Sequence, residues 1–191
     1  MKELILASGS PRRKELLEQA GFSFQVEPSD FEEDMTLEIP PAELAQELSR
    51  GKAEAVARNN ADAVVLGADT FIVFEGTLLG KPHTEEEAVR TLQRLNGTSH
   101  TVITGFTVIE AARDKRVSRA VETTVYFCNL SEEEIGTYVQ THEPLDKAGA
   151  YAIQGRGAIF VEKIEGDFYN VVGLPLCEVA RVLKDFGITP A

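Results

Sequence analysis

Short apolar runs alternate along the chain with stretches in which apolar residues recur every three or four positions. The first pattern is typical of buried strands and the second of amphipathic helices, so their alternation predicts an α/β protein. Strands are expected at about residues 4–7, 22–26, 63–68, 71–74, 77–79, 99–111, 117–129, 158–164 and 168–172. Helices are expected at about residues 11–20, 41–58, 84–96, 131–141 and 175–186.

Short signals at the ends of these segments support the assignment. Ser10-Pro11 supplies an N-cap and a first-turn proline for the first helix, and Ser131 with Glu134 forms a capping box. Gly51 either weakens the second helix or marks a bend in it. Glu165-Gly166 predicts a hairpin between the last two strands.

The charge balance narrows the range of ligands. The chain has 191 residues with 31 acidic and 19 basic side chains, which gives a net charge of −12. Such a surface repels nucleic acid polymers and anionic membranes, although a local basic pocket still suits a small anion. At this length a single domain over residues 1–191 is expected.

Neither a signal peptide nor a membrane-spanning segment is recognisable in the sequence. No stretch approaches the roughly 20 apolar residues that a membrane span needs. Cys128 and Cys177 stand far apart outside any paired motif, which indicates reduced core thiols. We therefore expect a soluble cytoplasmic protein with no membrane partner. The wide separation of His83, His100 and His142 argues against a histidine-rich metal site.

The first candidate for chemistry lies between the first strand and the first helix, at Ser8-Gly9-Ser10-Pro11-Arg12-Arg13. The N-terminus of a helix offers unpaired N–H groups and the positive end of the dipole, so it suits a phosphate. The glycine allows close approach, the hydroxyls add donors, and arginines bind phosphate oxygens bidentately. The alternative is a capped surface helix with solvated arginines. Two arginines oppose the dipole of a first turn, which favours the anion site.

The second candidate is Asp69, which the pattern places just after a hydrophobic strand. Carboxylates at such positions often hold Mg²⁺ or activate water, and a plain aspartate turn is equally compatible. Lys81 follows in a turn after the next hairpin. The segment 76–81 has the wrong glycine spacing for a P-loop and is followed by Pro82, so that motif is excluded.

The third candidate is the glycine-rich segment 146–157 between regular elements. Its three glycines and alternating polar residues suggest a loop shaped for a ligand. Gln154 carries both a donor and an acceptor in its amide and is able to read the edge of a nucleotide base.

These residues together resemble the Maf family of nucleoside triphosphate pyrophosphatases. The resemblance extends from about residue 4 to residue 186 and rests on several blocks in matching order: residues 6–17, 67–70, 80–82, 143–151, 153–155 and 172–175. It implies an elongated mixed sheet flanked by helices, with two lobes around a cleft, similar to inosine triphosphatase. It also implies cleavage between the α- and β-phosphates with a divalent metal, Mg or Mn, and commonly a homodimer.

The resemblance also implies roles for individual residues. Asp69 matches the general base and, with Glu33, would hold the metal. The positions that separate subgroups carry Arg12, Thr70 and Gln154, a trio that resembles the dTTP/UTP-hydrolysing branch. Further polar positions of the cleft match Ser8, Ser10, Arg13, Glu33, Lys52 and Lys81. Ala152 stands where the family usually has glycine, which raises the question of strain in that loop.

The predicted function is therefore a house-cleaning hydrolysis of dTTP, UTP and modified pyrimidine relatives to the monophosphate and pyrophosphate. The nearest alternative is the 7-methyl-GTP branch, whose pattern differs at the subgroup positions. A non-enzymatic regulator of septum formation is a second alternative. Such a protein would not need Lys52, Asp69 and Lys81 together.

Overall fold

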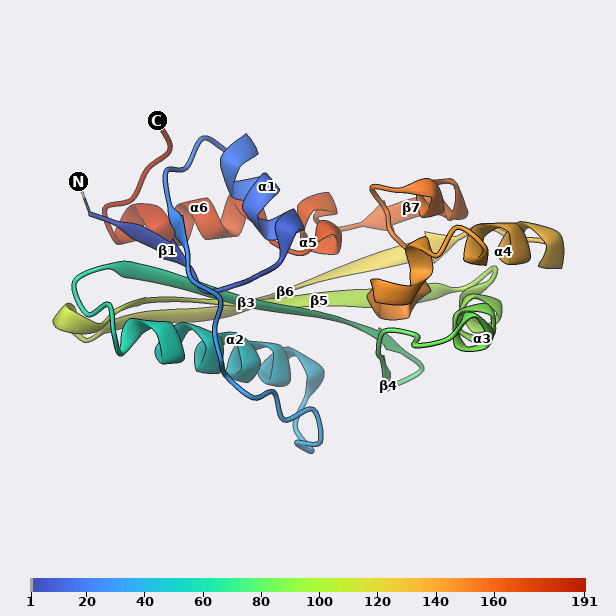
Figure 1. The fold of residues 1–191 in the computed structure, drawn as a ribbon, viewed down its shortest axis with the longest axis horizontal. Helices are drawn as coiled ribbons and strands as arrows, with labels where there is room; N and C mark the ends of the chain where they lie inside the picture. The colour runs from blue at the N-terminus through green and yellow to red at the C-terminus, as the bar shows by residue number, and fades with distance from the viewer. Residues whose placement is uncertain (1) are drawn as a thin grey trace. The chain divides into compact units, whose positions relative to one another are not determined.

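A computed structural model describes residues 2–191. Seven strands form one mixed sheet in the order β2-β1-β3-β5-β6-β7, with β4 paired to β3, and helices flank it (Figure 1). This confirms the predicted α/β class. The strands are β1 (Leu4–Leu6), β2 (Gln25–Val26), β3 (Val64–Phe74), β4 (Thr77–Leu79), β5 (Ser99–Glu110), β6 (Lys115–Phe127) and β7 (Val161–Glu165). The α-helices are α1 (Pro11–Gln19), α2 (Pro41–Ala57), α3 (Glu85–Leu95), α4 (Glu132–Val139), α5 (Phe168–Val172) and α6 (Leu176–Asp185). Short 3₁₀ turns are η1 (Ala111–Arg113), η2 (Glu143–Asp146), η3 (Ala148–Ala150) and η4 (Arg156–Phe160).

Two compact units divide the chain. The first comprises the chain up to Thr70 together with Thr104–Val121 and Gly173–Ala191. The second comprises Phe71–Ile103 and Glu122–Val172. Each unit has a hydrophobic core of its own.

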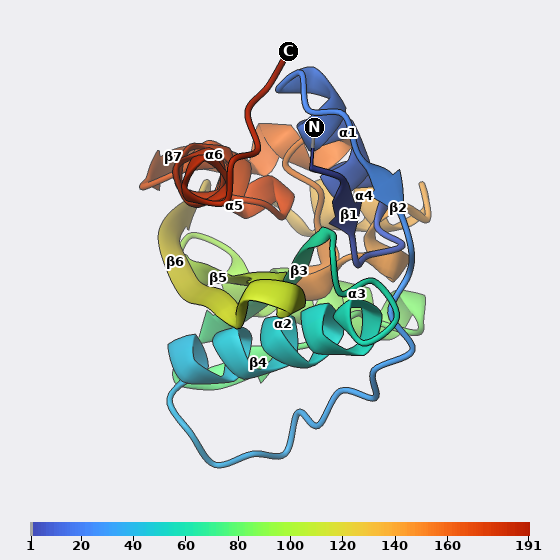
Figure 2. The ribbon, with the colours of Figure 1, turned by 90° about the vertical axis from the view of Figure 1, so that its left-hand side faces the viewer.

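In the first unit, β1 pairs in parallel with β2 on one side and with β3 on the other. The chain moves outward from β1 to β2 through α1 and then back to β3 through α2. Because parallel crossovers are right-handed, opposite directions of travel place the two helices on opposite faces of the sheet. Figures 1 and 2 show this arrangement, with α2 on one face and α1 and α6 on the other.

Helix α2 lies unusually close to the sheet at two glycines. A Cβ on Gly67 of β3 would stand 2.4 Å from the carbonyl oxygen of Ser49, and one on Gly105 of β5 would stand 2.0 Å from that of Ala45. Both glycines are therefore required by the approach of the helix backbone rather than by a turn. The adjacent core contains Ile5, Ala7, Ala53, Val56, Ala57, Ala63, Val65 and Ile109.

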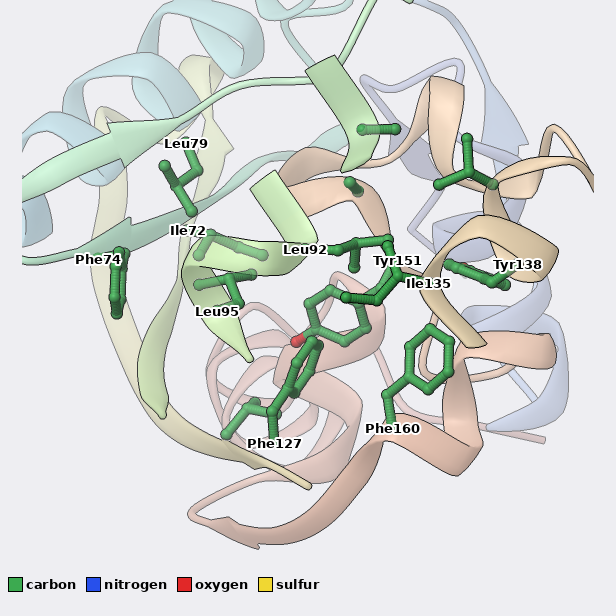
Figure 3. Packing of buried hydrophobic residues seen from close by; sticks show 14 of the residues in the cluster. Ile72, Phe74, Leu79, Leu92, Leu95, Phe127, Ile135, Tyr138, Tyr151 and Phe160 are labelled. Carbon is green, nitrogen blue, oxygen red and sulfur yellow. The ribbon is translucent and has the colours of Figure 1, made fainter. Parts of the chain in front are cut away.

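In the second unit, β3 and β4 form the predicted hairpin at Glu75-Gly76, where both residues have positive φ, 49° and 74°. Two positive φ values give the turn that suits the twist of a hairpin. Helices α3 and α4 cover a cluster of aliphatic and aromatic side chains (Figure 3). The rings of Phe127 and Tyr151 pack edge to face at 4.8 Å.

The predicted hairpin at residues 158–172 is wrong. β7 pairs antiparallel with β6 instead, and residues 168–172 form helix α5. The carboxylate of Asp167 accepts the N–H groups of Tyr169 at 2.8 Å and Asn170 at 3.4 Å, which caps the first turn. The expected strand at 22–26 is also shorter than predicted, since only Gln25–Val26 pairs.

Among residues 2–191, no helix combines the length and the apolar character that crossing a bilayer requires.

Candidate active site

The loop after β1 brings Ser8 and Ser10 to the N-terminus of α1. Pro11 occupies the first helical turn as predicted, but the Ser10 hydroxyl makes no capping hydrogen bond. Ser8 is buried instead, and its Oγ accepts hydrogen bonds from the Ser10 N–H at 3.3 Å and from Arg13 at 3.1 Å. The first turn of α1 is therefore stabilised by the hydrogen bonds to the Ser8 hydroxyl and not by a side-chain cap at Ser10.

Arg13 is buried and hydrogen-bonds to residues from distant parts of the first unit's sequence. It is only 8% exposed, and three of its N–H donors reach the Ser8 hydroxyl at 3.1 Å, the Thr70 hydroxyl at 3.0 Å and the Gly173 carbonyl at 2.9 Å. The Thr70 hydroxyl also bonds that of Thr104 at 2.8 Å. These residues form the Arg13 group: Ser8, Arg13, Thr70, Thr104 and Gly173.

The Lys52 group consists of Glu33, Lys52 and Asp69. The ammonium of Lys52, on α2, lies 2.5 Å from the carboxylate of Asp69 and 2.6 Å from that of Glu33. Asp69 is 8% exposed, whereas Glu33 belongs to the exposed loop before α2. Two carboxylates from separate segments thus converge on one cation.

The two groups lie on opposite faces of β3. Successive residues of a strand point to opposite faces, so Asp69 faces α2 while Thr70 faces α1. They are close enough to interact electrostatically. Burial lowers the pKa of Arg13, and Arg12 lowers it further, while Asp69 and Glu33 oppose that shift.

The prediction that Asp69 follows the end of a strand is wrong. β3 continues from Val64 to Phe74, so Asp69 lies within it. The glycine and the aspartate resemble a turn signal in the sequence. In the structure Gly67 accommodates α2 and Asp69 pairs with Lys52 of the same helix, so neither residue breaks the strand.

Gly51 neither ends nor interrupts α2. The helix runs through it, and the ring of Phe31 lies against it, so that a Cβ would stand 2.2 Å from Cζ of Phe31. The ring therefore attaches the loop that carries Glu33 to the helix that carries Lys52.

The remaining predicted residues are more accessible. Arg12 and Ser10 are half-buried in the first unit. Lys81 and Gln154 belong to the second unit, where each is exposed. Sequence reasoning missed Thr104, which lacks any local signal, and also Gly173 and Glu143, each of which lies in one of the blocks quoted above.

The carboxylates suit a hard divalent cation. Mg²⁺ is commonly bound by one or two carboxylates, with substrate phosphates and water completing the shell. Asp69 and Glu33 approach a common point that already holds a cation, the Lys52 ammonium. Among residues 2–191, the structure contains no group of three or more His, Cys, Asp or Glu side chains placed to hold a metal ion.

Comparison with known proteins identifies the family. A family model described as Maf-like protein matches residues 3–186. The chain belongs to the Maf family. Maf-family relatives include the dTTP/UTP pyrophosphatase of Bacillus cereus (strain ATCC 10987 / NRS 248), 52% identical over 98% of this chain and 92% of that protein. The protein of the same name from Bacillus anthracis (strain CDC 684 / NRRL 3495) is 51% identical over 98% of this chain and 97% of its own length.

Solved structures of lower identity share the fold of this Maf-family chain. The HAM1 protein from Coxiella burnetii matches with a TM-score of 0.51 at 16% identity, covering 97% of this chain and 100% of that one. The Ham1 protein of Staphylococcus aureus matches with a TM-score of 0.52 at 14% identity, covering 97% of each chain. At such identities the likeness concerns the fold alone.

The departure from the Maf-family pattern at Ala152 causes no backbone strain. Within the described residues, positive φ at non-glycine positions occurs at Glu75, Asp114, His142 and Ala150, and not at Ala152. Ala150, with φ of 62°, is the strained alanine of this segment.

Proposed function

We propose that this protein hydrolyses dTTP and UTP between the α- and β-phosphates, releasing the monophosphate and pyrophosphate. The observation that carries the proposal is the convergence of Asp69 and Glu33 on the Lys52 ammonium, at 2.5 and 2.6 Å. The name of the relatives, dTTP/UTP pyrophosphatase, at 51–52% identity supports the same reaction and favours it over 7-methyl-GTP hydrolysis. It also favours an enzyme over a non-catalytic septum regulator. The proposed substrates also include modified pyrimidine nucleotides.

Each group of the first unit has a role in this reaction. Attack of water on the α-phosphorus requires an activated nucleophile, neutralised phosphate charge and in-line placement. Asp69 is buried beside a cation and acts as the general base that accepts the proton of the water. Lys52 and Arg13 supply positive charge to the triphosphate, with the N–H groups around Ser8 and Ser10 as further donors.

A divalent metal, Mg or Mn, completes the proposal. Asp69 and Glu33 are the residues that would hold it. When bound, such an ion neutralises phosphate charge and lowers the pKa of a coordinated water. The substrate is an anion and the chain has a net charge of −12, so the positive charge of the metal ion is needed to offset their repulsion.

Base selection and phosphate binding involve four residues, of which Lys81 and Gln154 are exposed and Arg12 and Thr70 are half-buried. Arg12, Thr70 and Gln154 are proposed to favour thymine and uracil, and Lys81 to bind substrate. Thr70 has little freedom for this role, because its hydroxyl is already engaged with Arg13 and Thr104. Gln154 is exposed and carries the better donor and acceptor for a base.

The experiment is a nucleotide panel assayed with Mg²⁺ or Mn²⁺. Pyrophosphate release from dTTP or UTP is expected, and release of orthophosphate alone would contradict cleavage at the α–β bond. Asp69→Asn should lower turnover by about 10²–10⁴-fold, the usual contribution of a general base. The matched control Asp62→Asn removes an exposed carboxylate of the same unit and should leave turnover unchanged.

A cytoplasmic homodimer is part of the proposal. The mass in solution, measured by light scattering, tests the dimer, and a mass equal to one chain of 20.9 kDa would contradict it.

A further inference from the structure

Glu143 lies between the loop that carries Gln154 and Tyr138 of α4, and its carboxylate accepts hydrogen bonds from both. Its carboxylate accepts hydrogen bonds from the backbone N–H of Arg156 at 3.1 Å, the N–H of Gly157 at 3.2 Å and the hydroxyl of Tyr138 at 2.8 Å. Burial alone would raise the pKa of Glu143, but these bonds outweigh it and the pKa is lowered. These hydrogen bonds therefore favour the charged form of the carboxylate.

Tyr138 joins the other end of the same loop to Glu143. Its hydroxyl donates to Glu143 and accepts the N–H of Ala152 at 3.1 Å. Its ring packs edge to face on Phe160 at 4.8 Å, within the cluster of Figure 3. The backbone is thus anchored at residue 152 and again at residues 156 and 157, with Gln154 exposed between the anchors.

Two of the three glycines in segment 146–157, Gly155 and Gly157, are explained by these anchors. A Cβ on Gly155 would stand 2.4 Å from the Glu143 carboxylate, and one on Gly157 would stand 2.8 Å from the Tyr138 hydroxyl. Neither glycine has the positive φ that would otherwise require it. Contacts with Glu143 and Tyr138 therefore determine the backbone of this segment, whose sequence suggested a loop shaped for a ligand.

We propose that Glu143 is a positioning residue that holds Gln154 in the orientation needed for base selection, with Tyr138 as its partner. The inference rests on the proposed function, because it identifies the residues behind the proposed preference for thymine and uracil. Glu143 acts through the backbone of the loop and not by contact with the substrate. All of the contacts involved belong to the second unit.

The test compares nucleotide preference in Glu143→Gln, Tyr138→Phe and Gln154→Ala. A glutamine cannot accept all three hydrogen bonds, since its amide nitrogen is a donor. We expect the ratio of kcat/KM for dTTP to that for CTP to fall about tenfold in each variant, as for the loss of one well-placed hydrogen bond. Turnover of the poorer substrate by Glu143→Gln and Tyr138→Phe should stay within about threefold, because the Asp69 site is untouched. Glu162→Gln, an exposed charge change in the same unit, is the matched control and should leave the ratio unchanged.

Hydrogen exchange supplies a readout that does not depend on activity. The amides of Arg156 and Gly157 should lose protection in Glu143→Gln and keep it in Glu162→Gln. Retained protection in Glu143→Gln would overturn the proposal. If that variant does not fold, Tyr138→Phe decides, because it keeps the ring against Phe160 and removes only the hydroxyl.

The outcomes separate this inference from the function on which it rests. A wild-type protein that releases no pyrophosphate from dTTP or UTP refutes the proposed function itself. A wild-type preference that Gln154→Ala alters and Glu143→Gln and Tyr138→Phe leave unchanged refutes only the positioning role. A preference that none of the three variants alters also refutes it, because selection then resides outside this loop.

Discussion

Gly51→Ala tests how the loop carrying Glu33 is attached to the site. Gly51 lies inside α2, directly before Lys52, and the ring of Phe31 rests on it. A Cβ at this position would stand 2.2, 2.3 and 2.6 Å from three ring carbons, which real side chains do not tolerate. Because the obstacle is a side chain at the surface, the ring can move away, and it takes its loop with it.

Two opposing contributions determine the change in stability. Alanine is about 1 kcal/mol more favourable than glycine inside a helix. Phe31 is 37% exposed, so releasing its buried part costs about 1–2 kcal/mol of apolar burial. The free energy of unfolding should therefore stay within about 1 kcal/mol of the wild-type value.

Activity should fall although stability hardly changes. Glu33 is two residues from Phe31 and reaches Lys52 at 2.6 Å, so displacement of the ring removes Glu33 from the site. Loss of about 1.4 kcal/mol of transition-state stabilisation corresponds to a tenfold lower kcat/KM. Phe31→Ala should lower kcat/KM equally, and the double variant should add nothing further, because both changes release the same contact.

The assay combines pyrophosphate release from dTTP with urea unfolding of the single and double variants. Full activity in Gly51→Ala would show that the Phe31 contact does not position Glu33. Additive losses in the double variant would show that the two residues act independently.

Three further predictions concern other parts of the chain. Gly105→Ala should destabilise the protein by about 2 kcal/mol or more, because the added Cβ would meet the backbone of α2. Gly136→Ala in α4 has open space around the added Cβ, so it should stabilise the protein by about 1 kcal/mol. Thermal unfolding measures both, and equal shifts in Tm would refute the packing argument. Burial lowers the pKa of His100 to about 4, so the folded state favours the neutral ring and stability is lost as pH falls below the unfolded value of 6.5. The free energy of unfolding should drop by about 2 kcal/mol more between about pH 7.5 and about pH 5 in the wild type than in His100→Gln, and parallel urea titrations of the two would contradict this. Arg13→Lys should lower both Tm and kcat/KM, because an ammonium cannot reproduce the fork that reaches three acceptors; wild-type values of both would show that charge alone suffices.

Elements with strong local signals were predicted well. The Ser131–Glu134 capping box is present with both of its hydrogen bonds, and the hairpin at Glu75-Gly76 forms as expected. In these cases the deciding interactions join residues within a few positions of one another, so they can be found by inspecting the sequence.

Elements whose conformation depends on distant partners were misassigned. Residues 168–172 have the apolar, β-branched character of a strand, yet they form a helix in which the Asn170 amide donates to the Val102 carbonyl and the Thr123 hydroxyl on distant strands. Asp69 looks like a turn residue, yet a helix packed on Gly67 keeps it inside β3. Local propensity is a weak guide where tertiary contacts outweigh it.

The sequence by itself determined the α/β class, the acidic charge, the family and the identities of the candidate site residues. Only the tertiary structure decided their partners. Arg13 donates to a carbonyl 160 positions away, and Lys52 reaches a carboxylate 17 positions away on another element. Such contacts arise because right-handed crossovers place α1 and α2 on opposite faces of the same strand, which leaves neighbouring residues of β3 in two different groups. The sequence specifies the chemical groups of these side chains, whereas their pairing depends on how the helices pack on the sheet.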